Sequence, residues 1–496
     1  MRGLLLPTIL LLFNLWSFNQ AYSQGLLKKN TYELEAGAYI SSTKNLPFWL
    51  HSNQYGEIPL QSNVLTLRGQ MEKEYNEGDF KKQKLKKWSY GYKVRAVANV
   101  GKVNQLLIPE IYFKTKFKAF EFYVGRKKEI FGLTDTTLGS GSYIWSGNAL
   151  PIPKIQIAIP NYIPILKNKL ISVKGNFSHG WFGSADSTKN YFLHQKSIYF
   201  RIGKPFWKIN LHAGLNHQVQ WGGSPTKPFI QGGSNAYISK YGSDLEAYFY
   251  VLTGKALIPD GKYVSGQFSG EGGNRSGNHL GTIDFAIEFN NSFSNILLYK
   301  QSIYEDGSLA VLSNVNDGLY GISLTKKGAT KGLIKINFEL LDTRNQGGEL
   351  SALGITTPQL RGQDDYFNNA TYEEGWVYKK NTIGTAFLMP ISNSPFLSSK
   401  FGSTKINPNY ILNNRVKAYS IGIYSKIKSV ELKTRVSLSE NLGSYLYAPF
   451  NVKQLSIMQQ ISFPVKKYFV HTNIGYDNSG LFDKNLGIVF LIKRYF

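Results

Sequence analysis

The sequence predicts an all-β protein: a closed antiparallel transmembrane β-barrel of about 18 strands, with a small helical plug element and long extracellular loops. Two observations predict this class. Apolar and polar residues alternate with a period of two over most of the chain, in segments of roughly ten residues separated by turn signals. Tyrosine, phenylalanine and tryptophan make up 14% of the chain, which fits the two belts of rings that a barrel places at the lipid–water boundaries.

The first residues have the pattern of a secretory signal peptide. Arg2 gives a basic start, residues 4–16 form an apolar core, and Ala21 and Ser23 are small residues at the positions that a signal peptidase reads. We therefore expect residues 1–23 to be a signal peptide and residues 24–496 to form the mature barrel. The alternative is a retained anchor, but the apolar stretch is shorter than the ~20 residues that a spanning helix needs.

Composition and charge exclude several classes of protein. The chain has no cysteine, which removes disulfide frameworks, thiolate metal sites and cysteine nucleophiles. Beyond the signal peptide no apolar run reaches the ~18 residues of a transmembrane helix, so a helical membrane protein is excluded while a barrel is not. The formal net charge of +25 favours an anionic partner, either lipopolysaccharide phosphates or an acidic polysaccharide, and not nucleic acid after export. Alternatively, the lysines simply decorate periplasmic turns and loop bases.

Individual strands can be read from the alternation. One face of a strand is formed by Tyr90, Tyr92, Val94, Ala96, Ala98 and Val100. A hairpin is expected at Lys118, because residues 111–117 alternate up to it and residues 120–124 alternate away from it. Allowing about 25 residues per strand and connection gives on the order of 18 strands, within 16 to 20. A soluble β-sandwich or propeller is the alternative, but the single continuous array and the abundant aromatic residues argue against it.

The C-terminus carries a further barrel signal. The apolar residues of the last strand alternate toward Phe496, the final residue, through Leu486, Ile488, Phe490 and Ile492. This pattern resembles the terminal strand that the outer-membrane barrel insertion machinery reads, so that machinery is an expected partner during biogenesis. Arg494 departs from the pattern, because that position is usually apolar.

Two regions interrupt the strand pattern. Residues 42–60 are expected to hold a short helical plug element, because Pro47 can begin a helical turn and Gly56 can end it. Residues 138–166 are expected to be a proline-rich loop or lumen insert, because proline lacks the N–H that a closed strand ladder requires.

Long connections at 222–243, 259–281 and 342–375 are expected to face outward, since periplasmic turns stay short in such barrels. Aromatic faces and planar polar groups suit sugar rings and hydroxyls. The candidate polysaccharide-binding residues are Trp145, Trp221, Arg361, Tyr366 and Tyr372. The alternatives are that the tryptophans are girdle residues and that the loop residues are simply solvated.

No catalytic, cofactor or metal site is predicted. Among the seven histidines, His212 and His217 come closest to a ligand pair, but residues five apart on a strand point to opposite faces. The chain has no Gly-x-Ser-x-Gly elbow, Walker loop or His-Glu-x-x-His motif. A hydrolase could still assemble its residues from separate strands, so it remains the least favoured alternative to a binding protein.

Three segments resemble the Wzi family of outer-membrane capsule assembly proteins. They are SGNALPIP at 146–153, HQVQWGG at 217–223 and the segment 46–59, which ends in YGEIP. The resemblance implies a closed 18-stranded barrel, blocked below by a small helical plug and above by loops, that acts without catalysis as an outer-membrane lectin and holds exported capsular polysaccharide on the cell surface. The protein is expected to be a monomer. Leu150 stands where the family pattern has an arginine, so no role of that cation carries over. The residues alone leave a porin as the leading rival to the lectin.

Overall fold

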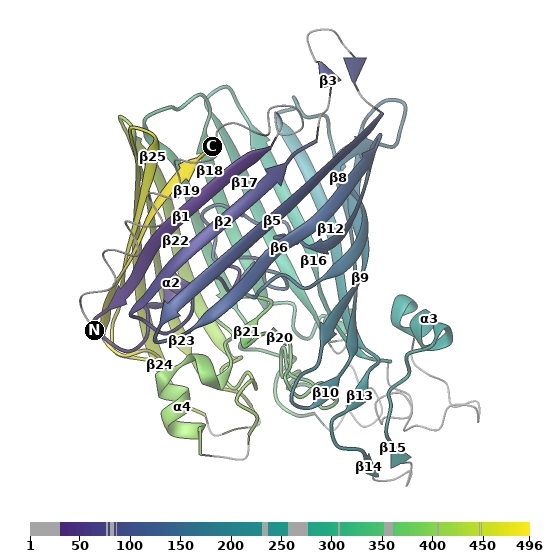
Figure 1. Ribbon diagram of the computed structural model, residues 1–496. Coiled ribbons are helices and arrows are strands. Elements are labelled where there is room, and N and C mark those ends of the chain that lie inside the picture. The colour runs from purple at the N-terminus through teal and green to yellow at the C-terminus, as the bar shows by residue number, and fades with distance from the viewer. Residues whose placement is uncertain are drawn as a thin grey trace, which may run out of the picture.

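The computed structural model describes residues 30–75, 78–79, 84–85, 87–230, 237–255, 276–305, 308–351, 361–403, 406–445, 447 and 449–496. Its wall is one 18-stranded antiparallel sheet. Each wall strand pairs with the wall strands before and after it, and β1 pairs with β26, which closes the barrel (Figure 1). The predicted fold class and strand number are thereby confirmed. The predicted signal peptide lies outside the described residues.

The wall strands are β1 (Thr31–Ser41), β2 (Val64–Lys73), β5 (Trp88–Gly101), β6 (Gln105–Phe117), β7 (Phe120–Arg126), β8 (Lys154–Pro164), β9 (Ile171–Gly183), β11 (Tyr191–Ile202), β12 (Ile209–Trp221), β16 (Asn278–Asn290), β17 (Ser294–Glu305), β18 (Gly318–Lys326), β19 (Gly332–Asp342), β22 (Val416–Ile427), β23 (Val430–Asn441), β24 (Val452–Val465), β25 (Tyr468–Asp477) and β26 (Asn485–Tyr495).

The connections hold short elements. The helices are α2 (Phe48–His51), α3 (Leu245–Thr253) and α4 (Pro395–Phe401), with 3-10 turns η3 (Ser308–Val311) and η6 (Ile391–Asn393). Two-residue strands form the pairs β3–β4 (Gly78–Asp79, Lys84–Leu85), β10–β13 (Thr188–Lys189, Ser224–Pro225), β14–β15 (Phe229–Ile230, Tyr237–Ile238) and β20–β21 (Val377–Tyr378, Asn381–Thr382). In the part of the chain that the structure describes, no helix is long and apolar enough to cross a membrane.

The two ends of the barrel differ in the length of their connections. The C-terminal residue Phe496 lies beside Tyr32 at the start of β1, and this end, at the top of Figure 1, carries short turns. The predicted hairpin is one of them, with Lys118 in the left-handed region at φ 54°. The other end carries the long connections at 127–153, 222–277 and 343–415. Because barrels keep periplasmic turns short and extracellular loops long, the top of Figure 1 is the periplasmic end.

Side chains along the wall strands alternate between the outer surface and the lumen, as the sequence predicts. In β26 the predicted apolar series from Leu486 to Ile492 faces outward and is exposed, while Val489 and Leu491 between these residues are buried. The outward residues of the other strands, such as Phe113 and Phe285, are exposed apolar side chains in the same way. An apolar outer surface on a closed barrel is what a lipid bilayer requires.

The predicted insert at 138–166 is only partly outside the wall. Its second half forms wall strand β8, which pairs with both β7 and β9, so the prediction was wrong there. Pro160 is tolerated because it lies beyond Ala158, the last β8 residue that pairs with β7, and at the point where the β8–β9 register shifts. Backbone at a bulge or beyond the partner strand needs no ladder donor.

Candidate functional site

The first lumen segment is residues 42–63, between β1 and β2, which fold back into the barrel. Helix α2 packs against β24, β25 and β26. The backbone N–H of Phe48 donates to Asp477 Oδ2 of β25 over 2.8 Å, and Trp49 Nε1 donates to Ser437 Oγ of β23 over 2.9 Å. Polar wall residues therefore hold the apolar turn that the sequence predicted as a plug element.

The second lumen segment, residues 127–153, contains the first half of the predicted insert. Its backbone N–H groups donate to inward-facing wall side chains: Leu133 to Asp284 over 2.7 Å, Ser140 to Glu339 over 2.5 Å, and Tyr143 to Gln301 over 2.8 Å. A buried irregular segment needs such acceptors, because only part of its backbone pairs within the segment, as Phe131 N does with Trp145 O over 3.3 Å. The wall thus supplies the hydrogen bonds that a helix or sheet would otherwise make.

The third lumen segment belongs to the connection 343–415. It was predicted to face outward as a loop over 342–375, but its residues 366–389 are largely buried inside the barrel. It contacts the other two segments: Trp376 Nε1 donates to Ile144 O over 2.8 Å, Thr385 N to Tyr143 O over 2.8 Å, and the Phe387 ring lies 5.4 Å from that of Phe48.

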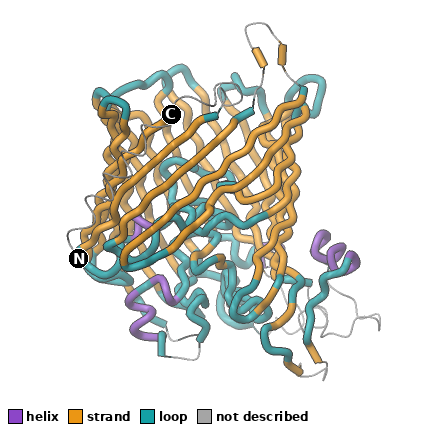
Figure 2. Tube along the Cα trace, viewed as in Figure 1, coloured by secondary structure: helices purple, strands orange, loops and turns teal. Residues whose placement is uncertain are grey.

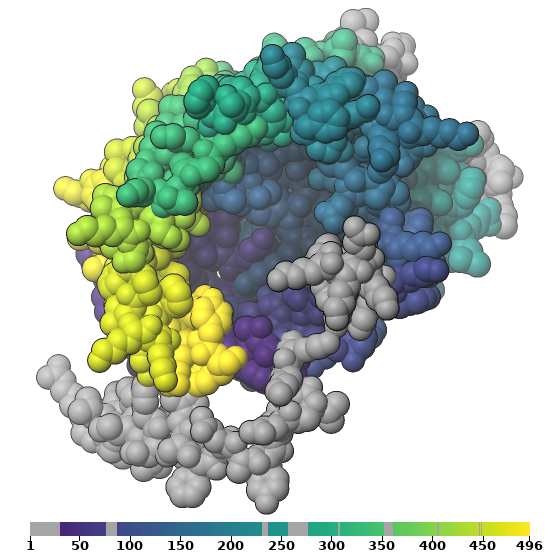
Figure 3. Space-filling model, turned by 90° about the horizontal axis from the view of Figure 1, so that it is seen from above, coloured from purple at the N-terminus to yellow at the C-terminus, as the bar shows by residue number. Residues whose placement is uncertain are grey.

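The three segments pack into one plug. Its loops occupy the extracellular half of the barrel (Figure 2), and its apolar side chains belong to a single buried cluster. From the periplasmic end, the ring of strands surrounds a deep hollow (Figure 3). The lumen is therefore filled on the extracellular side and open toward the periplasm.

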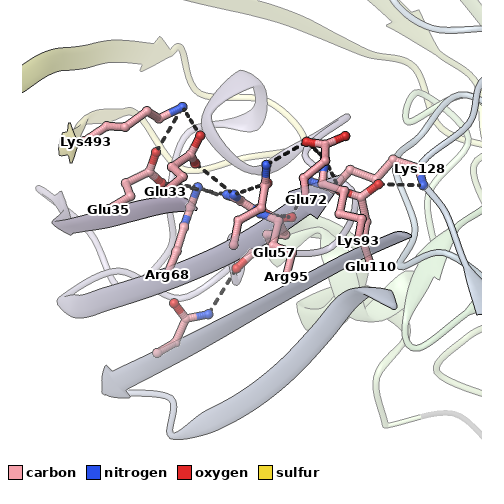
Figure 4. Close-up of polar contacts among 12 residues, drawn as sticks. Glu33, Glu35, Glu57, Arg68, Glu72, Lys93, Arg95, Glu110, Lys128 and Lys493 are labelled. Carbon is pink, nitrogen blue, oxygen red and sulfur yellow. Dashed lines mark hydrogen bonds and ion pairs between the residues drawn. The ribbon is translucent and has the colours of Figure 1, made fainter. Parts of the chain in front are cut away.

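A charged network ties the plug to the wall (Figure 4). Glu57 of the first lumen segment receives two hydrogen bonds from the Arg95 guanidinium, of 3.0 and 3.2 Å. It also pairs with Lys128 of the second segment. Arg68 lies 3.6 Å from Glu57 and 2.7 Å from Glu35 of β1. Glu57 therefore joins both plug segments to strands β2 and β5.

The network is balanced in charge. Its labelled members in Figure 4 are the carboxylates of Glu33, Glu35, Glu57, Glu72 and Glu110 and the cations of Arg68, Lys93, Arg95, Lys128 and Lys493. Burial alone raises the pKa of Glu57, but the charges of Lys128, Arg95 and Arg68 outweigh it and lower the pKa to about 2. With as many anions as cations, the network fits a structural anchor better than a site for a charged ligand.

The structure places three of the sequence-predicted binding residues inside the plug. Trp145 is buried, with its ring 6.0 Å from that of Trp376. The Tyr366 hydroxyl donates to Asp317 Oδ2 over 2.8 Å, and the Tyr372 hydroxyl donates to Gly222 O over 3.2 Å. These side chains are only 0–7% exposed, so they present no open face on which a sugar ring could stack.

The other two predicted residues lie elsewhere. Trp221 ends β12 and is buried against helix α3, and Arg361 is exposed on the connection 343–415. The structure does not bring the five predicted residues together into one site. Sugar binding through Arg361 stays a prediction, whereas the buried aromatic residues serve packing in this conformation.

The histidines form no metal centre in the described part of the chain. His212 faces the lumen beside Glu288 and His217 faces outward beside His279, as their spacing predicts. Nowhere among the described residues do three or more histidine or carboxylate side chains gather as a metal would require.

The extracellular rim carries a polar groove that the sequence analysis did not single out. It has a volume of about 630 Å³ and lies where the β1–β2 segment, the β5–β6 turn and helix α4 meet. Its lining residues are Lys44, Asn45, Leu60, Gln61, Ser62, Asn63, Lys102, Ser392, Pro395, Ser398 and Ser399. Two cations, three amides and several hydroxyls therefore face one opening.

The groove is built on hydrogen-bonded backbone. Ser62 N donates to Lys44 O over 2.9 Å, and Lys102 N donates to Asn63 O over 3.3 Å. The side chains of both lysines are exposed, and neither forms an ion pair with a carboxylate among the described residues. The groove thus offers amide and hydroxyl partners for sugar hydroxyls and two free cations for an acidic group.

Many of the other lysines lie in the periplasmic turns. Periplasmic turns carry Lys118, Lys167, Lys169, Lys204, Lys208, Lys327, Lys331, Lys428, Lys466 and Lys467. This distribution agrees with the alternative that many lysines only decorate turns. The net charge of the whole chain is therefore a weaker guide to the partner than the two lysines of the groove.

Comparison with known proteins gives one family and a set of barrels. The family model "Capsule assembly protein Wzi" matches residues 66–387, and among curated proteins none matches the chain. Pseudomonas aeruginosa OccK5 (OpdH) is similar in structure, at 7% identity, with 94% of this chain and 97% of that chain covered and a TM-score of 0.44. Acinetobacter baumannii OccAB4 is similar at 6% identity, covering 94% and 98%, with a TM-score of 0.43.

Proposed function

Because the chain belongs to the Wzi family of capsule assembly proteins, we propose that it is an outer-membrane lectin that binds exported capsular polysaccharide and helps to attach it at the cell surface. The expected family resemblance is confirmed: 146–153 and 217–223 lie within the matched residues, whereas the third segment, 46–59, lies before them. The closed barrel and its family make it an outer-membrane protein of a Gram-negative bacterium.

The observation that carries the lectin proposal is the groove at the extracellular rim. Lys44 and Lys102 are exposed there without carboxylate partners in the described structure, and Asn45, Gln61 and Asn63 surround them with planar amides. An acidic polysaccharide presents carboxylate or phosphate groups and many hydroxyls, which such side chains complement. The position of the groove at the outer opening suits a polymer that lies on the cell surface.

The filled lumen supports binding over conduction. The plug occupies the extracellular half of the barrel and is fixed to the wall by buried hydrogen bonds and ion pairs. A porin needs a wetted path through its constriction. We therefore rank the porin below the lectin, and a bilayer measurement separates them: a lectin reconstituted in planar bilayers should not conduct.

The groove can be tested with purified protein and with cells. We expect the double variant Lys44→Gln, Lys102→Gln to bind capsular polysaccharide purified from the same strain several-fold more weakly, and to release capsule from cells into the medium. The matched control is Lys466→Gln, Lys467→Gln, which removes the same charge from a periplasmic turn. Equal loss of polysaccharide binding in both variants would show that the loss comes from the lower net charge and not from the groove. Unchanged binding in the groove variant would refute the proposed site.

A further inference from the structure

Helix α3 lies outside the barrel wall, beside the extracellular ends of β9 to β12 (Figure 1). Its Val251 packs in a buried cluster with Val219 and Trp221 of β12. These two wall residues are on the same face of the strand as Leu215, which is exposed on the outer surface. The helix therefore covers lipid-facing positions of the wall and not the lumen.

Both ends of α3 are fixed. Asp244 caps the first turn, accepting a hydrogen bond of 2.8 Å from Ala247 N, and Gly254 ends the helix with φ 65°. The Nζ of Lys196, on β11, donates to the Leu252 carbonyl near the helix end. A cation at the C-terminal turn also complements the helix dipole.

The wall beneath α3 is polar where a barrel wall is expected to be apolar. His194 and Lys196 of β11, His217 of β12 and His279 of β16 all occupy outward positions, because they pair in register with Val219 or with one another. The histidines are 0–6% exposed. His194 Nδ1 lies 3.1 Å from the Tyr248 hydroxyl of α3, and His217 Nε2 lies 2.9 Å from His279 Nδ1.

The opposite face of α3 is apolar and uncovered by any described residue. Leu245 is 87% exposed and Phe249 is 55% exposed, and their spacing of four places them on one side of the helix. Glu246 is the one charged residue in the helix. A helix that is apolar on both sides is normally buried on both sides.

The surroundings of α3 identify what covers this second face. The exposed wall residues next to it on the same strands are Trp181, Ile198 and Leu215, so the helix continues a lipid-facing surface. Trp181 and Trp221 mark the level of the extracellular aromatic belt. A second copy of the chain is a weaker candidate, because one face of nine residues falls far short of the ~1,200 Å² that a stable interface buries.

We propose that α3 is an interfacial helix that lies in the outer leaflet, with Leu245 and Phe249 among the acyl chains and Ala247, Tyr248 and Val251 on the barrel. The helix thereby shields the polar wall patch of His194, Lys196, His217 and His279 from lipid. The helical hydrogen bonds, the Asp244 side-chain cap and the Lys196 contact supply backbone partners that apolar surroundings do not. The helix thereby holds residues 245–253 at the membrane surface, whether or not the groove binds sugar.

The absence of cysteine allows a direct test. A nitroxide label is attached to Phe249→Cys in the mature protein refolded into liposomes, and its collisions with oxygen and with a water-soluble nickel chelate are measured by electron paramagnetic resonance. Oxygen concentrates among acyl chains and the nickel chelate stays in water. We expect the label to favour oxygen, as a label on the wall variant Leu215→Cys should, while the matched helix control Ser399→Cys on α4 favours nickel.

Each other outcome overturns the proposal. If the label at 249 collides with nickel as often as the label at 399, the helix face lies in water. If its spectrum broadens from spin–spin coupling in liposomes, and the broadening vanishes when labelled protein is diluted with unlabelled protein, a second copy covers the helix. A Leu245→Cys label should repeat the result of Phe249→Cys, and heat-modifiable mobility on gels verifies that every variant is folded.

Discussion

Replacing Glu57 by glutamine tests how the plug is held in the barrel. Glu57→Gln keeps the shape of the side chain but removes the charge that faces Arg95, Lys128 and Arg68. Its side chain is only 4% exposed, so three cations would lose their shared anion in a poorly solvated place. Removing one partner of a buried ion pair costs about 3–5 kcal/mol.

The pKa of Glu57 gives an independent magnitude. A fall from 4.5 to about 2 corresponds to about 3 kcal/mol of preference for the charged form. The free energies from the broken ion pair and from the pKa of Glu57 are therefore similar. We therefore expect Glu57→Gln to lower the free energy of releasing the plug from the wall by about 3 kcal/mol.

The assay has to report on the plug separately from the wall. Hydrogen exchange followed by mass spectrometry on protein in lipid nanodiscs resolves peptides from residues 42–63 and from strands such as β25. We expect faster exchange in the plug peptides of Glu57→Gln and little change in the wall peptides. Urea unfolding gives the accompanying loss of global stability.

The matched control is Glu72→Gln, which removes a carboxylate from the same network. The side chain of Glu72 is 22% exposed and pairs with Lys93 at 3.5 Å, so a cost below about 1 kcal/mol is expected. Equal effects of the two variants, or unchanged exchange of residues 42–63 in Glu57→Gln, would show that the network does not anchor the plug. A double-mutant cycle with Lys128→Gln then isolates the coupling between the two lumen segments.

Three further predictions use the same unfolding and exchange measurements. Because the pKa of Glu57 is lowered in the folded protein, its contribution to stability is complete above pH 4.5 and is lost as the pH falls toward about 2. Plug peptides of the wild-type protein should therefore exchange faster on acidification, and those of Glu57→Gln should change less. Equal acid sensitivity of the two proteins would contradict this. Gly422→Ala should destabilise the protein by about 1–3 kcal/mol, because its Cβ would lie 2.5 Å from Leu138 O of the plug, whereas the control Gly69→Ala meets only a methyl at 3.5 Å and should be near neutral. Trp49→Phe removes the indole hydrogen bond to β23 and should cost about 1–2 kcal/mol, measured as a lower urea midpoint; an unchanged midpoint would mean that water replaces the bond without loss.

The parts of the fold that follow from local pattern were predictable. Alternation along each strand depends only on which side chains face lipid, so the predicted strand number, the hairpin at Lys118 and a last strand that runs toward Phe496 agree with the structure, where β26 ends at Tyr495. The prolines of β8 misled the prediction, because the sequence does not show that Pro160 lies beyond the end of its neighbour β7.

The candidate site was less predictable, because its residues come from segments far apart in the chain. Lys44 and Lys102 meet α4 only after the barrel closes and the connection 343–415 folds over its end. The aromatic residues Trp145, Tyr366 and Tyr372 looked suited to sugar stacking, yet the plug uses them as core. Residue type alone cannot distinguish a ring that stacks on a ligand from a ring that fills a lumen.

The polar patch under α3 shows how the position of a residue on its strand can reveal contacts that residue type alone does not. The alternation of side chains along a strand places His194, Lys196 and His217 on the lipid-facing side, where charged or polar side chains are costly. Such a run therefore requires either that the strand has left the membrane or that another element covers it. Here Trp221 follows on the same face and is buried against α3, so another element covers the run. The sequence contains the covering element as well: LEAYFYVLT at 245–253 follows Asp244, a helix cap, and precedes Gly254, a helix stop. If the label at 249 meets lipid, interfacial helices of barrels can be sought in sequences by one pattern. The pattern is a polar run on the outward face of a strand, with a capped apolar helix in the adjoining loop.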